Sequence, residues 1–238
     1  ELSGGAFDIT VAPLMRCWGI ADGEHRVPSP GELAKTRECV GMHLVHLDAK
    51  NITVQFERPG VQVDLGAIGK GFALDIADEI VREADITSAL IHGGTSTVCA
   101  IGSPPEKDFW KVAIEHPGCE QPGADIPEYK RIVAVAELND ESLSVSAGWG
   151  KAFEENGVSY GHVLDPRCGQ PTQNTLLAAV ALPSGTAADA WSTAMLVSGV
   201  TGPVALGQVG ESARSLLLLP NGDSGFRTLN DGFESALS

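Results

Sequence analysis

Three oxygen-bearing side chains share one face of a predicted helix in the C-terminal part of the chain. In the stretch TAADAWSTAML, Asp189, Ser192 and Thr193 stand at positions i, i+3 and i+4, which are neighbours on a helix surface. A carboxylate and two hydroxyls are hard oxygen ligands, the class that Mg²⁺ prefers, and Mg²⁺ completes its shell with water and ligand phosphate. A structural role is equally compatible with this spacing: Asp189 would favour a helix N-terminus, and Ser192 and Thr193 would face a neighbouring strand.

A glycine-rich segment, GAIGKG from Gly66 to Gly71, stands where a predicted strand passes into a helix. Glycines there let backbone N–H groups approach a phosphate at the positive end of the helix, and Lys70 adds a positive charge. The segment is neither the dinucleotide fingerprint GxGxxG nor a P-loop. Taken alone it favours a tight strand-to-helix turn over a phosphate site.

A histidine stands three residues before a carboxylate in GHVLDPRCGQP, where Pro166 and Gly169 predict a turn. His162, near Asp165, could act as a general base, although an ordinary histidine at a strand end is the commoner case.

Two further segments offer ligand contacts. Asp8 beside Phe7 in GAFDITVAPL could bind the polar edge of a ligand while the ring packs beside it, or Asp8 could cap the following helix. Trp149 in SVSAGWG could stack on a flat ring or fill a core.

The charge of the chain limits its partners. With 31 acidic and 16 basic residues, the formal net charge is −15, and it disfavours nucleic acid. A phosphorylated ligand would need a metal ion or backbone N–H groups to offset its charge. We expect no transmembrane segment, because no run of about 18 apolar residues is present. The five cysteines are widely scattered and disfavour a structural zinc site.

Periodicity and turn signals predict the elements that position these residues. We expect a short helix within FDITVAPLMRCW and a hairpin around residues 48–51. A second helix should begin after a Ser29–Glu32 capping box, with Pro30 at its first position, and run through Leu33 to about Val40. A short strand through Asp64 should lead into a helix with one apolar stripe, formed by Ile68, Phe72, Ile76 and Ile80. The segment of residues 117–130 should be a surface loop.

The remaining segments read mainly as strands. Strands are expected in SALIHGG, STVCAIG, WKVAIEHP, RIVAVAEL, ESLSVSAG, VSYGHVLDP, TLLAAVALP and SLLLLP, with a helix from about Thr186 to Ser198. Adjacent strands without helices between them indicate antiparallel pairing. The predicted fold class is therefore α+β, with mostly antiparallel sheets and packed helices.

The order of these segments resembles that of the ApbE family. GAFDITVAPL, VDLGAIGKGFALD, IHGGTSTVCAIG, SAGWG, GHVLDPRCGQP and ADAWSTAMLVSG follow one another from Gly4 to about Gly199. The family consists of FAD:protein FMN transferases. The resemblance implies an α+β fold of two related halves, which is itself related to the T-fold.

The resemblance also implies an activity. This activity is Mg²⁺-dependent transfer of FMN from FAD, the substrate, onto a Ser or Thr hydroxyl of an acceptor protein, with release of AMP. Bound Mg²⁺ and Lys70 would neutralise charge developing on the leaving AMP.

Roles carried over from the family fall on individual residues of this chain. His162 and Asp165 match the HxxDP motif as catalytic residues, with His162 the candidate base. The FAD contacts map to Ala6, Phe7, Asp8, Asp64, Lys70 and the backbone near Leu164. The Mg²⁺ ligands map to Asp189, Thr193, Ser192 and the backbone carbonyl of Ala67.

The chain departs from the family pattern in places. Thr95 stands where the family commonly has Asn, SAGWG replaces a Thr-Ser-Gly-Asp run, and Cys168 replaces Thr. We expect residues 1–238 to form one ApbE-like domain that lacks the family's N-terminal segment. Hydrolysis of FAD to FMN and AMP, or flavin binding without catalysis, are the alternative functions. The sequence leaves the compartment open: the chain as given would stay in the cytoplasm, whereas export with lipid anchoring would require an N-terminal signal.

Overall fold

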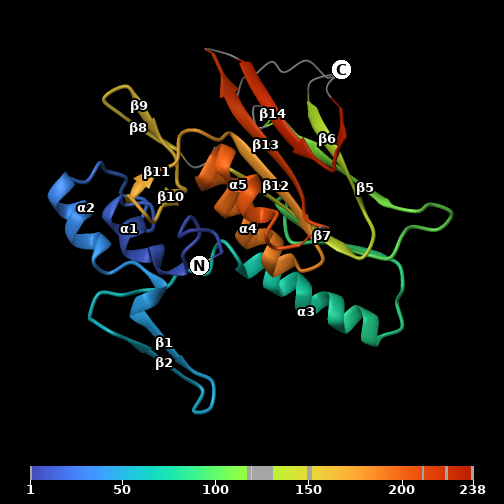
Figure 1. The fold of residues 1–238 in the computed structure, drawn as a ribbon, viewed down its shortest axis with the longest axis horizontal. Helices are drawn as coiled ribbons and strands as arrows, with labels where there is room; N and C mark the ends of the chain where they lie inside the picture. The colour runs from blue at the N-terminus through green and yellow to red at the C-terminus, as the bar shows by residue number, and fades with distance from the viewer. Residues whose placement is uncertain are drawn as a thin grey trace.

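A computed structural model describes residues 2–116, 119, 131–148, 152–210, 212–222 and 225–236 (Figure 1). The helices are η1 (Ile9–Val11), α1 (Ala12–Cys17), α2 (Pro30–Arg37), η2 (Met42–Leu44), α3 (Gly69–Glu83), α4 (Gly185–Ser198), η5 (Gly199–Thr201) and α5 (Gly202–Leu206). The longer strands are β3 (Ala89–His92), β4 (Thr97–Ile101), β5 (Trp110–Glu115), β6 (Ile132–Leu138), β7 (Glu141–Ala147), β12 (Leu177–Leu182), β13 (Arg214–Asn221) and β14 (Gly225–Asp231). The shorter strands are β1 (Val45–Asp48), β2 (Thr53–Phe56), β8 (Phe153–Glu155), β9 (Val158–Tyr160), β10 (Leu164–Asp165), β11 (Gln170–Pro171) and β15 (Glu234–Ser235).

The centre of the fold is a six-stranded antiparallel sheet with the order β14-β13-β12-β7-β4-β3. The sheet consists of two groups of three neighbouring strands, β3-β4-β7 and β12-β13-β14, and each group is connected to one long helix, α3 or α4. The predicted α+β class with antiparallel sheets and packed helices is therefore confirmed.

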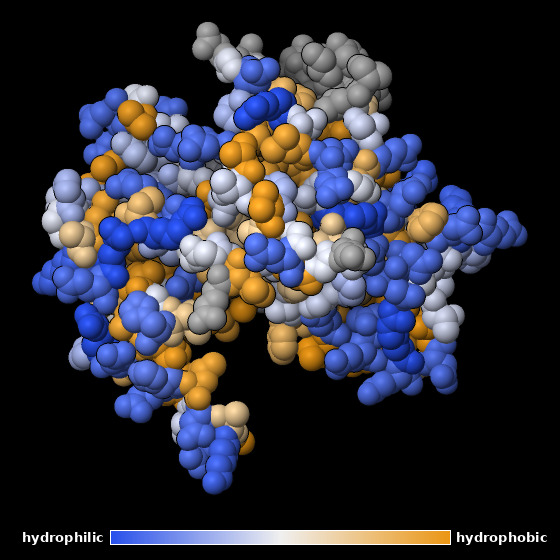
Figure 2. All heavy atoms as spheres, in the orientation of Figure 1, coloured by the Kyte–Doolittle hydropathy of each residue, from blue (hydrophilic) through white to orange (hydrophobic). Residues whose placement is uncertain are grey.

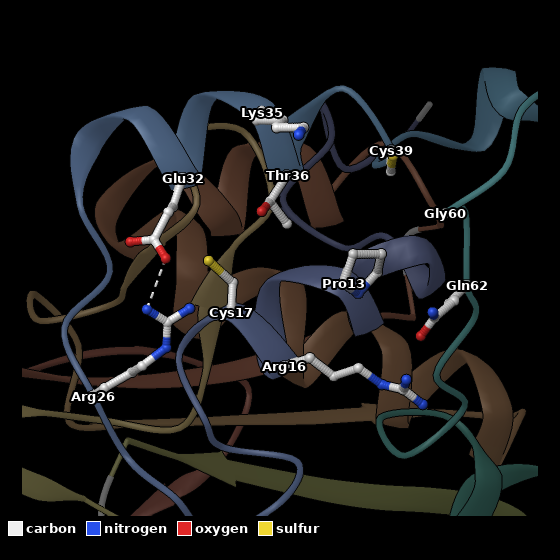
Figure 3. A pocket seen from close by; sticks show the side chains of 10 residues that line it. All are labelled: Pro13, Arg16, Cys17, Arg26, Glu32, Lys35, Thr36, Cys39, Gly60 and Gln62. Carbon is white, nitrogen blue, oxygen red and sulfur yellow. Dashed lines mark hydrogen bonds and ion pairs between the residues drawn. The ribbon is translucent and has the colours of Figure 1, made fainter.

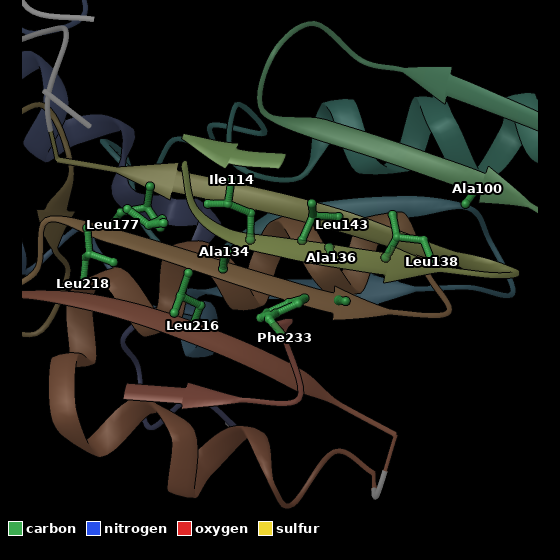
Figure 4. Packing of buried hydrophobic residues seen from close by; sticks show 13 residues of the cluster. Ala100, Ile114, Ala134, Ala136, Leu138, Leu143, Leu177, Leu216, Leu218 and Phe233 are labelled. Atoms are coloured by element: carbon green, nitrogen blue, oxygen red, sulfur yellow. The ribbon is translucent and has the colours of Figure 1, made fainter. Parts of the chain in front are cut away.

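Both faces of the central strands are covered, which explains their almost continuous apolar sequences. Successive side chains of a strand point to opposite faces. Leu177 and Ala179 of β12 therefore pack toward the three-stranded sheet β15-β6-β5, whereas Ala178 and Val180 pack toward α4 and α5. Figure 4 shows the first of these layers, with Ile114 and Leu138 of the small sheet above Leu216 and Leu218. The apolar side of α4 packs on one face of this sheet, and this packing determines where the polar side of α4 lies.

A second group of elements lies beside the sheet and contains α1, α2 and the hairpins β1-β2, β8-β9 and β10-β11 (Figure 1). Its core holds Leu14, Trp18 and Leu33. The indole N–H of Trp18 donates to the carbonyl of Gly169 over 2.8 Å, which ties α1 to the β10-β11 hairpin. The predicted capping box is present at α2, and the predicted hairpin around residues 48–51 is β1-β2.

Three local predictions need correction. The segment 61–65 forms no strand, because Asp64 is held by a single backbone bond to Ile9 instead of a ladder. VSYGHVLDP forms two short strands, β9 and β10, separated by a bend at His162. Phe72, Ile76 and Ile80 of α3 are exposed, since α3 approaches its neighbours through Gly71 and Leu74. Except for Cys119, the predicted loop of residues 117–130 lies outside the described residues.

The face in Figure 2 is mainly hydrophilic, with apolar side chains gathered along its middle. Among the described residues, no helix combines the length and the apolar character that a membrane crossing requires.

Candidate functional site

The Asp189 carboxylate joins the polar face of α4 to the glycine-rich turn before α3. One carboxylate oxygen accepts a hydrogen bond from the Gly71 backbone N–H at 3.1 Å, and the other accepts from the Ser144 hydroxyl at 2.9 Å. The Lys70 ammonium lies 3.9 Å from the second oxygen. Asp189 is only 3% exposed, so these partners take the place of the water that an exposed carboxylate would bind. Two motifs separated by more than one hundred residues therefore meet at one carboxylate.

Ser192 and Thr193 face β7, as the structural alternative predicts. The hydroxyl of Ser192 lies 2.7 Å from that of Ser146, and the hydroxyl of Thr193 lies 3.3 Å from the same oxygen. Ser192 also donates to the backbone carbonyl of Asp189 at 2.9 Å. The result is a cluster of hydroxyl oxygens beside a buried carboxylate, at the N-terminal end of α3.

Asp75 of α3 accepts hydrogen bonds from the first turn of α4, just as Asp189 of α4 accepts one from the first turn of α3. Its carboxylate accepts hydrogen bonds from the backbone N–H groups of Gly185 (2.6 Å) and Thr186 (3.0 Å) and from the hydroxyls of Ser184 and Thr186. The orphan N–H groups of the first turn of α4 are thereby satisfied. Sequence reasoning missed Asp75, although a carboxylate one turn after a glycine-rich helix start was a usable signal. Each of the two helices therefore caps the other.

This cap makes part of the stability of the protein depend on pH. Burial raises the pKa of the Asp75 carboxyl, but the bonds from Thr186, Gly185 and Ser184 outweigh burial and leave the pKa below its ordinary value. A depressed folded-state pKa stabilises the fold above the unfolded pKa of about 3.9, and this contribution is lost as pH falls through the folded value.

We therefore expect Asp75→Asn to lower the free energy of unfolding most near neutral pH. The difference from the wild type should shrink as pH falls below about 4, because protonation then removes the same charge from the wild type. Urea unfolding at a series of pH values measures this difference. Exposed Asp108→Asn is the control, and a difference that stays constant down to about pH 2.5 would contradict the assignment.

The two helices approach each other backbone to backbone at a pair of glycines. A Cβ on Gly71 would overlap the carbonyl oxygen of Gly185, and a Cβ on Gly185 would lie 2.9 Å from the carbonyl oxygen of Gly71. This contact brings the Gly71 N–H within reach of Asp189. Gly71 therefore has a packing role in addition to any role in phosphate binding.

The N-terminal segment lies beside α4 and beside the turn before α3. Ala6 is buried against the α4 side of the sheet, and Phe7 packs against the same cluster. Asp8 accepts hydrogen bonds from the backbone N–H and hydroxyl of Thr10, so it caps η1, and it also accepts from the Met42 N–H.

Asp64 is connected to the same region. Its N–H donates to the carbonyl of Ile9 at 2.7 Å, and its carboxylate accepts from the Gly66 N–H at 2.7 Å. Ala67 lies in the turn that follows. The predicted flavin contacts Ala6, Phe7, Asp8 and Asp64 are thus joined to the Asp189 region through packing and chain continuity.

The HxxDP residues lie where the β10-β11 hairpin begins. His162 occupies the bend before β10, and the adjacent Val163 packs against the α4 cluster. Leu164 points the other way, into the core with Trp18. The Asp165 carboxylate accepts from the Arg167 backbone N–H and guanidinium at 2.8–2.9 Å, so its described contacts hold the turn together. Its catalytic role stays a prediction. Trp149 lies outside the described residues.

The donor set around Asp189 suits a hard cation. Asp189, Ser192 and Thr193 present one carboxylate and two hydroxyls, and Ser144 and Ser146 add two more hydroxyl oxygens. Within the described ranges, no three His, Cys, Asp or Glu side chains come together as a metal site. A partly hydrated Mg²⁺ that also binds ligand phosphate needs few protein ligands. The residues therefore fit Mg²⁺ better than a metal that requires several imidazole or thiolate ligands.

A hollow of about 450 Å³ between α1 and α2 is separate from this region (Figure 3). Its described lining includes four charged side chains: Arg16, Lys35 and the ion-paired Arg26 and Glu32. None of the predicted site residues lines it. The residues predicted from the sequence to carry chemistry therefore lie outside this hollow.

Known proteins with similar sequences are flavin transferases by name. The chain is 31% identical to the FAD:protein FMN transferase of Haemophilus influenzae over 204 residues, which cover 84% of this chain and 57% of that protein. It is 27% identical to the FAD:protein FMN transferase of Vibrio cholerae over 229 residues, which cover 95% of this chain and 65% of that protein. The chain thus spans about three-fifths of the length of these relatives.

Solved structures agree with the sequence matches. The ApbE protein from Thermotoga maritima superposes with a TM-score of 0.82 at 28% identity, covering 98% of this chain and 72% of that chain. The flavinyl transferase ApbE from Pseudomonas stutzeri superposes with a TM-score of 0.80 at 27% identity. The match covers 97% of this chain and 68% of that chain. The sequence model of the ApbE family matches residues 1–211. The chain therefore belongs to the ApbE family.

Proposed function

We propose that this chain carries the catalytic site of an enzyme that transfers FMN from FAD to a Ser or Thr hydroxyl of an acceptor protein. The observation that carries the proposal is the contact of Asp189 with the first turn of α3. It places a buried carboxylate, several hydroxyls and Lys70 at the N-terminal end of α3. Helix N-termini favour anionic groups, and a diphosphate at this place would also meet the ammonium of Lys70. The names of the relatives support the same activity.

Mg²⁺ would be held by Asp189, Thr193 and Ser192, with the carbonyl of Ala67, and would neutralise charge on the diphosphate. Lys70 is exposed and can reach an outer phosphate oxygen. Phe7, Asp8 and Asp64 would bind the remainder of FAD together with Ala6 and the backbone near Leu164.

The transfer exchanges one phosphorus–oxygen bond for another. The acceptor hydroxyl oxygen attacks the FMN-side phosphorus, and the bond from that phosphorus to the bridging oxygen breaks. The bonding electrons leave with AMP, and the hydroxyl proton moves to His162, since an imidazole accepts protons near neutral pH.

Three outcomes of one experiment separate transfer from its alternatives. The chain is incubated with FAD and Mg²⁺ and with a pool of synthetic peptides that each contain one central Ser or Thr. Flavin fluorescence that stays on the peptide after the reaction mixture is denatured supports transfer. Free FMN and AMP without labelled peptide indicate hydrolysis, and bound but unchanged FAD indicates flavin binding alone; either result would overturn the proposal.

His162→Gln should lower the rate of peptide labelling by about 10²-fold, because a general base contributes 10²–10⁴-fold to such steps. The dissociation constant of FAD, measured by fluorescence titration, should change much less. The control is His46→Gln, since His46 is an exposed histidine of the β1-β2 hairpin. An unchanged labelling rate in His162→Gln would remove this residue from the mechanism.

A further inference from the structure

A cleft of about 560 Å³ lies beside the β8-β9 hairpin. Its walls come from the β8-β9 hairpin, from Gly148 at the end of β7, and from the segment leading into β12. This volume falls in the range of ligand-binding clefts. Figure 1 shows the β8-β9 hairpin projecting from the body of the molecule.

The cleft adjoins both parts of the proposed catalytic machinery. Gly161, which lines it, immediately precedes His162. Gly148, which also lines it, follows two residues after Ser146, whose hydroxyl contacts Ser192 and Thr193. These two walls touch, because a Cβ on Gly161 would lie 2.9 Å from the carbonyl oxygen of Gly148. The chain segments that line the cleft therefore continue within one or two residues into the candidate base and into Ser146 of the hydroxyl cluster.

The described lining of the cleft is uncharged and rich in small residues, which suits a polypeptide better than a phosphate. Among the described residues, the ten that line the cleft are uncharged: Gly148, Ala152, Gly157, Val158, Ser159, Gly161, Thr172, Gln173, Thr175 and Leu176. In a chain with a net charge of −15, a diphosphate has no reason to prefer this lining. Small and glycine residues instead leave backbone polar groups accessible to another backbone.

The edge of β9 points to an extended peptide. β9 pairs only with β8 among the described strands, so its other edge can accept an added strand.

We propose that this cleft receives an extended segment of the acceptor protein, which adds to the edge of β9 and presents its Ser or Thr hydroxyl to His162. The proposal rests on the transferase function. It assigns the acceptor to the cleft formed by β9 and the turn before β12.

The test uses a peptide recovered from the labelled pool and two matched valine substitutions. Val158 is a 43% exposed residue of β9 that lines the cleft, and Val54 is a 63% exposed residue of the other exposed hairpin, β1-β2. Val158→Trp should raise the KM for the peptide by about tenfold or more, equivalent to about 1.4 kcal/mol. The dissociation constant of FAD should stay within about twofold of the wild type. Val54→Trp should change neither quantity.

Each result decides between the two proposals. If the wild type labels peptide and Val158→Trp has an unchanged KM, the cleft proposal is overturned and the transferase proposal stands. If Val158→Trp weakens FAD binding as strongly as peptide use while Val54→Trp does not, the cleft belongs to the flavin and the acceptor assignment is wrong. If the wild type binds or hydrolyses FAD but labels no peptide, the transferase proposal fails and the cleft proposal fails with it. FAD binding that persists in Val158→Trp shows that the variant is folded.

Discussion

Asp189→Asn should lower the rate of flavin transfer by about 10²-fold or more while leaving the fold nearly as stable as the wild type. The amide oxygen can still accept from the Gly71 N–H, and the amide nitrogen can donate to the Ser144 hydroxyl, which rotates to accept. The hydrogen bonds are therefore kept while the charge needed to hold Mg²⁺ is lost. The variant should also need a higher Mg²⁺ concentration for its remaining activity.

Two comparisons make this result informative. Asp189→Ala should be less stable by about 2 kcal/mol, since it leaves the buried partners of the carboxylate without an acceptor. Exposed Asp22→Asn controls for the loss of one negative charge and should behave as the wild type. The measurements are peptide labelling at a series of Mg²⁺ concentrations and urea unfolding. Wild-type labelling by Asp189→Asn at every Mg²⁺ concentration would exclude Asp189 as a metal ligand and leave it only its capping role.

Gly71→Ala should have the largest effect on stability, about 3 kcal/mol or more, because an added methyl group has no space at the crossing of α3 and α4. The overlap is with backbone of Gly185, which cannot rotate away as a side chain could. The two helices must separate, and both reciprocal caps then weaken, since Asp189 loses Gly71 and Asp75 loses Gly185.

Gly69→Ala is the matched control within the same motif. A Cβ on Gly69 meets nothing within 4 Å, and the residue is exposed at the first position of α3. Alanine there should be neutral or stabilising by up to about 1 kcal/mol, because it restricts the unfolded chain. Urea unfolding of both variants measures the contrast. Equal stabilities would show that the two helices do not depend on close backbone contact at Gly71.

The elements that local sequence determines were predicted well. TLLAAVALP and SLLLLP became β12 and β13, the helix expected from about Thr186 became α4, and the capping box at Ser29 is present. Their signals depend on neighbours a few residues apart, on side-chain period and on cap chemistry. The strand expected through Asp64 does not form, because a strand also needs a partner that local sequence does not specify. Among the described strands none pairs with this segment, and Asp64 bonds instead to Ile9.

The helix over residues 69–83 shows the limit of periodicity. Phe72, Ile76 and Ile80 do lie on one helix, as the period predicts, but their side chains are exposed. The helix packs through Gly71 and Leu74 instead. A hydrophobic stripe identifies one face of a helix, whereas the packing partner decides which face is buried. The close approach to Gly185 selects the glycine face, because only a face without side chains admits another backbone.

By itself, the sequence determined the fold class, most of the regular elements and the types of side chain available for chemistry at Asp189, Ser192, Thr193 and His162. The tertiary structure alone decided which of them meet. Gly71 and Asp189 are 118 positions apart, and Asp75 and Gly185 are 110 apart. Periodicity and capping rules act over a few residues, so they cannot specify such contacts. Close packing of α3 on α4 over a covered sheet specifies them, and it places a carboxylate that serves both the fold and the proposed chemistry at the N-terminal end of α3.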